Sequence, residues 1–395
     1  MLGNNRGIAL VVTLLVVALL TITVIEFTYS VQIDQRMARH ALYGLQASLL
    51  ARSGIHLGEA LLLHDNDPTV DAYTEEWCPQ PDTAPEGDRP ACTVDAADTQ
   101  LVLPDNTRLR VQILDESSKL NLNMTRPQTV NQWRAARANT NTSQLFQAWR
   151  TAFGNLTGGR GVDPTAVDAL ADYWDRLYEI SAGPAPVGTP QPGGAAGEPT
   201  PAATAGAALA VLDFPSLDDA SVVPGLGGNA IRKIRSVVTA TDSRRQTQVN
   251  VNTASREVLA AIVGDGEIVE QIVAQRESAP VQQRDLGTLL AGVNRQDPEK
   301  RYVPSMLGVR SAYFLIRASA IVNANPVTGR GGIRRSASLL VRRDPKPGVL
   351  ANAPAGTPRW TLTRLDWQKE GGAVLFRSEV APDARGADAL RQGIF

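Results

Sequence analysis

Apolar residues fill the start of the chain without interruption, and their number predicts a membrane-spanning helix. Residues 8–25 read IALVVTLLVVALLTITVI and contain no charged side chain. A helix of about 18 residues is about 27 Å long, close to the thickness of the hydrocarbon core of a bilayer. A cleaved secretory signal fits less well, because its apolar run covers only about 7 to 15 residues. We therefore expect a signal anchor, with Arg6 on the cytoplasmic side.

Apolar residues then recur every three or four positions, which predicts that the same helix continues to about residue 66. No proline interrupts residues 8–67. We expect the first part of the helix to lie in lipid or among neighbouring helices and the second half to pack on a globular head. Gly54 and Gly58 either let another backbone come close or only weaken the helix. The apolar stripe of the second half consists of Ala38, Leu42, Leu45, Leu49, Leu57, Ala60 and Leu61.

Alternation of apolar and polar residues predicts strands in two distant parts of the chain. The earlier strand places Leu109, Val111 and Ile113 on one face. The later segments are rich in β-branched, aromatic and aliphatic residues. We expect all of them to form one antiparallel sheet, so that the region between them is an insertion. The expected strands are residues 108–114, 313–322, 333–343 and 360–365.

The inserted region has helical periodicity instead. Residues 144–153 and 163–178 are expected helices, the second opened by Asp163 as N-cap and Pro164 at the first position. Residues 181–205 are rich in Pro, Gly and Ala and have no apolar period. Such a segment buries too little apolar surface to offset its ordering entropy, so we expect a mobile excursion.

Composition and charge are those of an ordinary globular protein. The chain has 395 residues, of which 43% are hydrophobic and 20% are charged, and this length is sufficient for two domains. It has 39 basic and 40 acidic residues. This balance disfavours binding to nucleic acid.

Two stretches nevertheless resemble helix-hairpin-helix units, which present backbone N–H groups to a DNA phosphate. They are residues 222–234 and 249–277. The second carries Asp265, Glu267 and Glu270 around its hairpin, where they would repel a phosphate. We therefore favour structural hairpins, and a membrane-anchored DNA-binding protein of an uptake system is the alternative function.

Cys78 and Cys92 are the only cysteines and lie in a segment rich in Pro and Asp. Behind a membrane anchor in an oxidising compartment we expect one disulfide, which closes a short loop and contributes about 3 kcal/mol. Two free thiols are the alternative, and a zinc site would need more ligands.

Residues 65–98 are expected to form a loop with many acidic residues. Carboxylates are the oxygen ligands that calcium prefers. No EF-hand spacing is present, so we favour a solvated acidic loop, and a calcium site is the alternative. The candidate calcium ligands are Asp65, Asp67, Asp95 and Asp98.

No combination of residues predicts catalysis. His40, His56 and His64 are the only histidines, and all lie in the predicted long helix. Ser117 and Lys119 lack the Ser-x-x-Lys spacing of a nucleophile and its base. We expect no catalytic site and no required cofactor.

The N-terminal features together resemble the type IV pilin and pseudopilin class. A short cationic leader ends in Gly7, the apolar block begins at Ile8, and the helical period continues far beyond it. Most members of this class carry Glu at the fifth mature position, where this chain has Val12. The large minor pseudopilins of type II secretion, the component K family, usually lack this Glu, so the departure narrows the resemblance to that family.

Two internal segments also resemble the component K family. Residues 115–123, DESSKLNLN, are similar to the segment that introduces its inserted helical domain, with Ser118 in place of the usual Gly. Residues 248–259, QVNVNTASREVL, are similar to a segment inside that domain. The matching residues are Asp115, Glu116, Lys119, Asn121, Asn123, Asn250, Asn252, Thr253 and Ala254.

The resemblance implies an α+β fold, in which a pilin-like long N-terminal helix packs on an antiparallel β-sheet that carries a large inserted all-α domain. It implies that a prepilin peptidase cuts between Gly7 and Ile8 and methylates the new amine. It also implies a subunit that is not an enzyme, and that joins minor pseudopilins I and J and other pseudopilus subunits. The anchor is expected in the inner membrane of a Gram-negative bacterium and the head in the periplasm.

The expected domains follow from these patterns. The leader is followed by the long helix, the first part of the pilin-like domain, the inserted helical domain and the second part of the pilin-like domain. Their limits are residues 1–7, 8–66, 67–124, 125–305 and 306–395.

Overall fold

The computed structural model describes most of the chain. The domain limits predicted from the sequence fall partly between the described ranges and stay predictions. The described ranges are residues 5–67, 69–79, 92–95, 103, 106–124, 140–182, 213–242, 246–293, 300–323, 332–346, 359–365 and 377–380.

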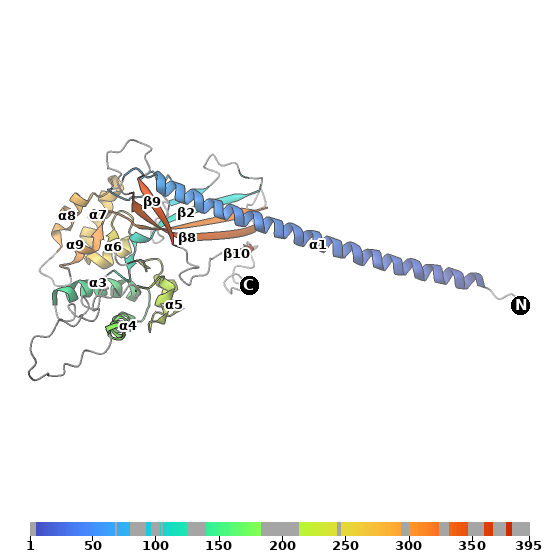
Figure 1. Ribbon diagram of the computed structural model, residues 1–395, viewed down its shortest axis with the longest axis horizontal. Helices are drawn as coiled ribbons and strands as arrows, with labels where there is room; N and C mark the ends of the chain where they lie inside the picture. Colours follow the sequence, from blue (N-terminus) through green and yellow to red (C-terminus); the bar gives the residue numbers. More distant parts are fainter. Residues whose placement is uncertain are drawn as a thin grey trace, which may run out of the picture.

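One long helix, α1 (Asn5–His64), extends far from the rest of the chain at its N-terminal end (Figure 1). The helix predicted for residues 8–66 is therefore present. By length and composition, α1 is the one helix of the described residues that can cross a membrane. Its most apolar window has a mean hydropathy of 2.7, and none of that window is buried.

An antiparallel sheet packs against the second half of α1. Its strands follow the order β1-β2-β7-β8-β10, and β9 also pairs with β8. The pairing of β2 with β7 confirms that the helical region is inserted between neighbouring strands of one sheet. The strands are β1 (Cys92–Asp95), β2 (Arg108–Asp115), β7 (Tyr313–Val322), β8 (Ile333–Pro345), β9 (Trp360–Leu365) and β10 (Arg377–Val380).

Strand β1 corrects the prediction that residues 65–98 form only a loop. Cys92 lies opposite Ile113 and Asp95 lies opposite Arg110, so residues 92–95 form an edge strand. Four residues are too few for alternation to distinguish a strand from a loop. Residues 92–95 form a strand because they pair with β2, and the sequence of these four residues gives no sign of that partner.

Small residues predominate on the face of α1 that packs on the sheet, together with the larger Ile55 and Leu62. A Cβ atom on Gly54 would lie 2.7 Å from the Cβ of Ala318, and one on Gly58 would lie 2.5 Å from Cγ2 of Ile316. The two glycines therefore serve the close approach of the helix to its own sheet. The buried small residues of this face are Gly44, Ala47, Ala51, Gly54 and Gly58.

Part of the predicted apolar stripe faces away from the head, so the prediction was wrong for its first leucines. Leu42, Leu45 and Leu49 are 52%, 58% and 54% exposed. Leu57 and Leu61 are half-buried against the sheet, as predicted. Apolarity alone does not mark the packed face here, because a helix this close to a sheet needs small side chains at the contact.

The inserted region forms a cluster of helices near one end of the sheet (Figure 1). Both predicted helices are present, and Asp163 Oδ1 accepts a hydrogen bond of 2.9 Å from the backbone N–H of Thr165, as expected of an N-terminal cap. Beyond residue 182, the predicted excursion over residues 181–205 lies outside the described residues. The helices are α3 (Thr140–Gly158), α4 (Thr165–Ala182), α5 (Gly228–Ile234), α6 (Arg256–Val263), α7 (Gly266–Ser278), α8 (Gln283–Leu289) and α9 (Val303–Met306).

Short elements connect the sheet to these helices. A 3-10 turn, η2 (Glu116–Ser118), follows β2, and β3 (Leu120–Asn121) pairs in parallel with β4 (Val238–Thr239). Two further two-residue strands, β5 (Val249–Asn250) and β6 (Leu307–Gly308), also pair in parallel. The turns η3 (Leu217–Val222) and η4 (Leu290–Gly292) complete the described elements.

Two hydrophobic cores divide the head. One core lies between α1 and the sheet and includes Leu62, Ile113 and Ile316. The other lies among the inserted helices and includes Trp149 and Leu259, together with Leu120 and Leu122. The segment directly after β2 therefore leaves the sheet and becomes part of the helical core.

Candidate functional site

The first candidate surface is the exposed side of α1 that faces away from the sheet. We call Ala38, Leu42, Leu45 and Leu49 the outer stripe; all four are exposed. Leu49 and Ala51 are two residues apart, which is about 200° around a helix, so the outer stripe lies opposite the sheet-facing row. An exposed apolar stripe at this spacing is the typical packing surface for another helix.

Positive charge flanks the outer stripe. Arg36, Arg39 and Arg52 are exposed, and no acidic residue occurs between Asp34 and Glu59. This part of α1 therefore carries an apolar stripe in a cationic surrounding. A helix with its own apolar stripe and acidic flanks would match both features.

The apolar half of α1 also satisfies its few polar groups internally. The hydroxyls of Thr21, Thr23 and Thr28 donate to backbone carbonyls four residues earlier, at 2.7, 2.9 and 2.7 Å. Polar groups that lie in hydrocarbon need internal partners of this kind. Gly7 and Ile8, the predicted cleavage site, lie within α1.

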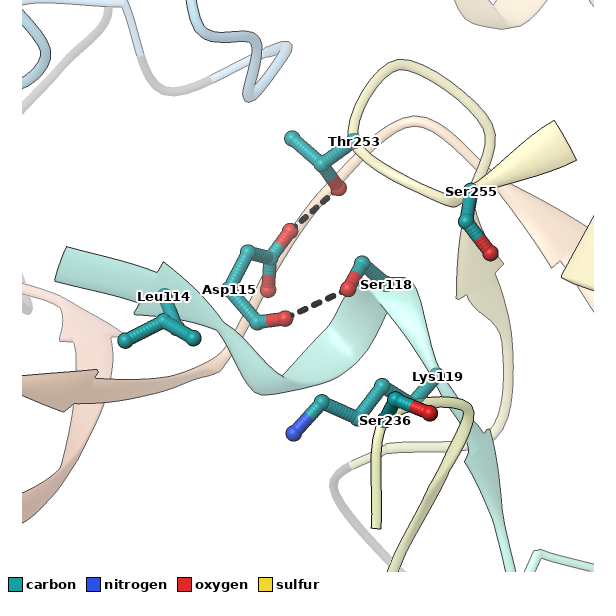
Figure 2. A pocket seen from close by; sticks show the side chains of 7 residues that line it. All are labelled: Leu114, Asp115, Ser118, Lys119, Ser236, Thr253 and Ser255. Atoms are coloured by element: carbon teal, nitrogen blue, oxygen red, sulfur yellow. Dashed lines mark hydrogen bonds between the residues drawn. The ribbon is translucent and has the colours of Figure 1, made fainter. Parts of the chain in front are cut away.

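The second candidate site is a buried polar network, which we call the junction network. Asp115, at the end of β2, is 1% exposed and accepts hydrogen bonds from Thr253 Oγ1 and Ser311 Oγ, each at 2.5 Å. The Asp115–Thr253 bond is drawn in Figure 2. Asn250 Nδ2 donates to Asp71 O at 2.9 Å and to Ser311 Oγ at 2.7 Å. The two family-like motifs, far apart in sequence, therefore meet at one carboxylate.

Asparagine side chains in the junction network replace backbone partners. Asn121 Nδ2 donates to the carbonyls of Thr241 and Gln246, both at 3.2 Å. Asn252 exchanges two bonds with the backbone of Val281, at 3.1 and 2.8 Å. Asn123 exchanges two bonds with the backbone of Phe214, both at 3.1 Å. Because each amide both donates and accepts, these side chains hold chain segments together where no regular ladder exists.

Glu116 and Lys119 form a buried ion pair beside this network. Burial alone would raise the pKa of Glu116, but the neighbouring ammonium of Lys119 lowers it below its ordinary value. All predicted motif residues, including Thr253 and Ala254, are buried. Their chemistry is that of internal connections.

The pocket beside Asp115 is too small for an organic ligand. Its volume of ≈ 10 Å³ is about that of one water molecule. Figure 2 shows the residues that line it: Leu114, Asp115, Ser118, Lys119, Ser236, Thr253 and Ser255.

Sequence reasoning missed the buried cation of the head, Arg343. Its side chain is fully buried, pairs with Asp65 at 2.7 Å and with Asp71, and lies 4.6 and 4.2 Å from the ring centroids of Phe314 and Trp360. Burial lowers the pKa of Arg343 to about 10, against the attraction of Asp65. The alternation of β8 places Arg343 on the same face as the buried Val341, and a charged residue on a buried face was the available signal.

Three of the four predicted calcium ligands have other partners in the described part of the chain. Asp65 binds Arg343, Asp67 accepts two bonds from Thr69, and Asp95 pairs with Arg110. Asp98 lies outside the described residues. Oxygen atoms of Asp65, Asp71 and Glu75 instead lie within 4.8 Å of one another. Burial raises the pKa of Glu75 to about 8.

Cys78 and Cys92 belong to the same buried core, between α1 and the sheet. Cys92 Sγ lies 3.8 Å from the carbonyl oxygen of Trp77, the residue before Cys78. The two residues lie in one core, and the disulfide between them stays a prediction.

At the start of α7, two of the backbone N–H groups that could bind a phosphate are already bonded within the protein. Asp265 Oδ1 accepts hydrogen bonds from the backbone N–H groups of Glu267 and Ile268, at 3.0 and 3.3 Å. A carboxylate occupies the place that a DNA phosphate would need.

The cations of the other hairpin are bound within the protein. Arg232 bonds Asn229, Lys233 donates to the carbonyl of Gly161, and Arg235 pairs with Asp218. The two hairpins are therefore arranged as packing elements of the helical part.

Comparisons with known proteins give two findings. Residues 249–305 match the family model described as "Type II secretion system (T2SS), protein K". A chain of the crystal structure of the GspK-GspI-GspJ complex from the type 2 secretion system of enterotoxigenic Escherichia coli is similar, with 17% identity and a TM-score of 0.43; the match covers 84% of this chain and 96% of that chain. A search of the curated proteins finds no match.

Proposed function

We propose that this chain, a member of the protein K family of type II secretion systems by the match over residues 249–305, is a minor pseudopilin that acts at the tip of the pseudopilus. It is a structural subunit and not an enzyme. The observation that carries the proposal is the combination of the family region with a long helix whose apolar surface is exposed on the side away from its own sheet.

The membrane arrangement is part of this proposal. Residues 8–25 anchor the chain in the inner membrane, the head lies in the periplasm, and prepilin peptidase cuts between Gly7 and Ile8. Support comes from the high hydropathy and full exposure of the first part of α1. The mature N-terminal residue tests it: methylated Ile8 is expected, and a mature chain that begins at Met1 would refute the processing.

The partners we propose are minor pseudopilins I and J. In this proposal, helices of these subunits pack against the outer stripe of α1, and Arg39 and Arg52 favour a partner helix with acidic residues beside its apolar contact. A position at the tip fits the size of the helical insert, because a bulky head within a stack would separate neighbouring helices. Val12 fits the same position, because Glu at the fifth mature position is thought to pair with the amine of a subunit ahead, and a tip subunit has none ahead.

Co-purification of the full chain with tagged pseudopilins I and J from detergent-solubilised membranes tests the partner surface. Leu45→Glu, in the outer stripe, is expected to abolish recovery of the complex because it places a charge in an apolar contact. The matched control is Val222→Glu, since Val222 is 64% exposed on the helical insert. Equal recovery with both variants would refute the assigned surface.

We also propose that calcium binds among the acidic residues that follow α1. The support is the grouping of Asp65, Asp71 and Glu75, whose oxygens are the ligand type that calcium prefers. Arg343 already neutralises this cluster, so a calcium ion would have to displace its guanidinium. A higher Tm in millimolar calcium than in millimolar magnesium or chelator is expected; equal Tm values would leave Arg343 as the cation of this cluster.

A further inference from the structure

Asp115 differs from the other buried acidic groups of the head because no cation pairs with it among the described residues. Its carboxylate accepts bonds from neutral donors only: Ser117 N at 2.7 Å, Thr253 Oγ1 and Ser311 Oγ at 2.5 Å, and Asn250 Nδ2 at 3.4 Å. A buried carboxylate without an opposite charge is strongly disfavoured in its ionised form.

The charged groups around Asp115 do not neutralise it. Lys119 lines the same pocket, but its ammonium binds Glu116. Arg343 binds Asp65 and Asp71.

The remaining neighbours do not supply a positive charge to Asp115 either. Arg276 donates to the carbonyls of Val251 and Ala254. Tyr73 is half-buried, and desolvation of its phenol together with the charge of Asp115 raises the pKa of Tyr73. The environment therefore favours a neutral Asp115.

The partners of Asp115 suit either protonation state. The hydroxyls of Thr253 and Ser311 can donate to a carboxylate, and one of them can rotate to accept from a protonated carboxyl. The N–H groups of Ser117 and Asn250 can only donate, and they bond to the remaining lone pairs of the Asp115 carboxyl oxygens. The network thus accepts one proton at Asp115 through the reversal of a single hydroxyl, with no change in backbone contacts.

The position of Asp115 gives this proton a structural consequence. Asp115 lies where the chain leaves the sheet, Ser311 lies just before β7 where the chain returns, and Thr253 belongs to the helical insert. One carboxyl group therefore connects the sheet, the returning strand and the insert. A change in its charge acts on all three at once.

We propose that Asp115 is a proton-binding site of the folded head, and that its protonation strengthens the attachment of the helical insert to the sheet. Burial raises the pKa of Asp115 to about 6 from an ordinary value of 3.8, although the bonds from Ser311 and Thr253 act in the opposite direction. Between these two values the folded chain holds a proton that the unfolded chain has lost. Stability is thus greatest on the acidic side and falls as the pH rises through about 6.

The test is the Tm of the full chain in detergent between pH 4 and 8, compared with Asp115→Asn. The wild type is expected to lose Tm through a step near pH 6 that the variant lacks. Asp65 and Glu75 also have raised pKa values, but their contribution is common to both chains and cancels in the difference. Identical pH profiles of the two chains would overturn the proposal.

A second variant keeps the test decisive if Asp115→Asn does not fold. Thr253→Val has nearly the shape of the natural residue and removes one donor to the ionised carboxylate, so the step is expected to move to higher pH. Hydrogen exchange of residues 249–255 on both sides of the step provides a local readout when each rate is divided by the intrinsic rate at that pH, and greater protection is expected at the acidic side. A step that stays near pH 6 in Thr253→Val, or exchange that does not change across it, would refute the role of this network.

Discussion

Replacement of Gly58 by Ala tests the close approach of α1 to the sheet. A Cβ atom at position 58 would lie 2.5 Å from Cγ2 of Ile316, which is fully buried. Carbon atoms in contact normally lie about 3.5 to 4.0 Å apart, so either the helix or the strand must move by about 1 Å. Neither is free to do so without disturbing the core that they share.

The expected loss of stability follows from two opposing effects. Overpacking of a rigid core costs about 1 to 3 kcal/mol. Replacement of Gly by Ala inside a helix restores about 0.5 to 1 kcal/mol. The net destabilisation is therefore between about 0 and 2.5 kcal/mol, and its middle value of about 1 kcal/mol corresponds to a Tm that is lower by about 2 to 4 °C for a domain of this size.

Gly44→Ala is the matched control, since Gly44 lies on the same face of the same helix. The nearest atom to its added Cβ is Nη2 of Arg335, at 3.2 Å, and this is the end of a flexible side chain. Gly44→Ala is expected to be neutral or slightly stabilising. Thermal unfolding followed by near-ultraviolet circular dichroism measures both variants. A Tm for Gly58→Ala equal to or above that of Gly44→Ala would show that the contact with Ile316 does not determine how closely α1 approaches the sheet.

Three further outcomes are expected. Arg343→Met leaves the buried carboxylates of Asp65 and Asp71 without their cation. We therefore expect the free energy of unfolding, measured in urea, to fall by about 3 to 5 kcal/mol. A decrease no larger than that of typical surface variants would contradict the role of the cluster. For the predicted disulfide between Cys78 and Cys92, we expect the oxidised chain to resist alkylation under denaturing conditions and reduction to lower its stability by about 3 kcal/mol. Rapid labelling of both thiols without reductant would exclude the bond. In titrations with duplex DNA at low salt we expect no binding. Binding whose affinity falls steeply as the salt concentration rises would favour the DNA-uptake alternative instead.

The long elements were predictable because their signals are local. The apolar run of residues 8–25, the helical period beyond it and the four longer strands each depend on the spacing of neighbouring side chains, which the sequence states directly. The motif residues were also identifiable, but their partners were not. Asp115 and Thr253 bond across a large separation in sequence, and nothing near either residue indicates the other.

The packed side of α1 was the largest error. Leu42, Leu45 and Leu49 form the more apolar stripe, and hydrophobicity alone therefore favours them as the buried face. The sheet instead contacts a row of Gly and Ala, because the gain from many close backbone contacts requires that side chains be absent. Which of two usable faces a helix buries depends on the shape of its partner, and that shape belongs to strands at the other end of the chain.

The sequence by itself determined the apolar run at the N-terminus, the long helix, the four longer strands, the first two helices of the insert and the family-like motifs, since each is written in the periodicity or identity of adjacent residues. Only the tertiary structure decided how these parts meet: which face of α1 is left open for another helix, that Arg343 balances the aspartates after α1, and that two distant motifs converge on Asp115. The physical reason is that burial and charge balance depend on distances in space, and the fold sets those distances between residues that the sequence keeps far apart.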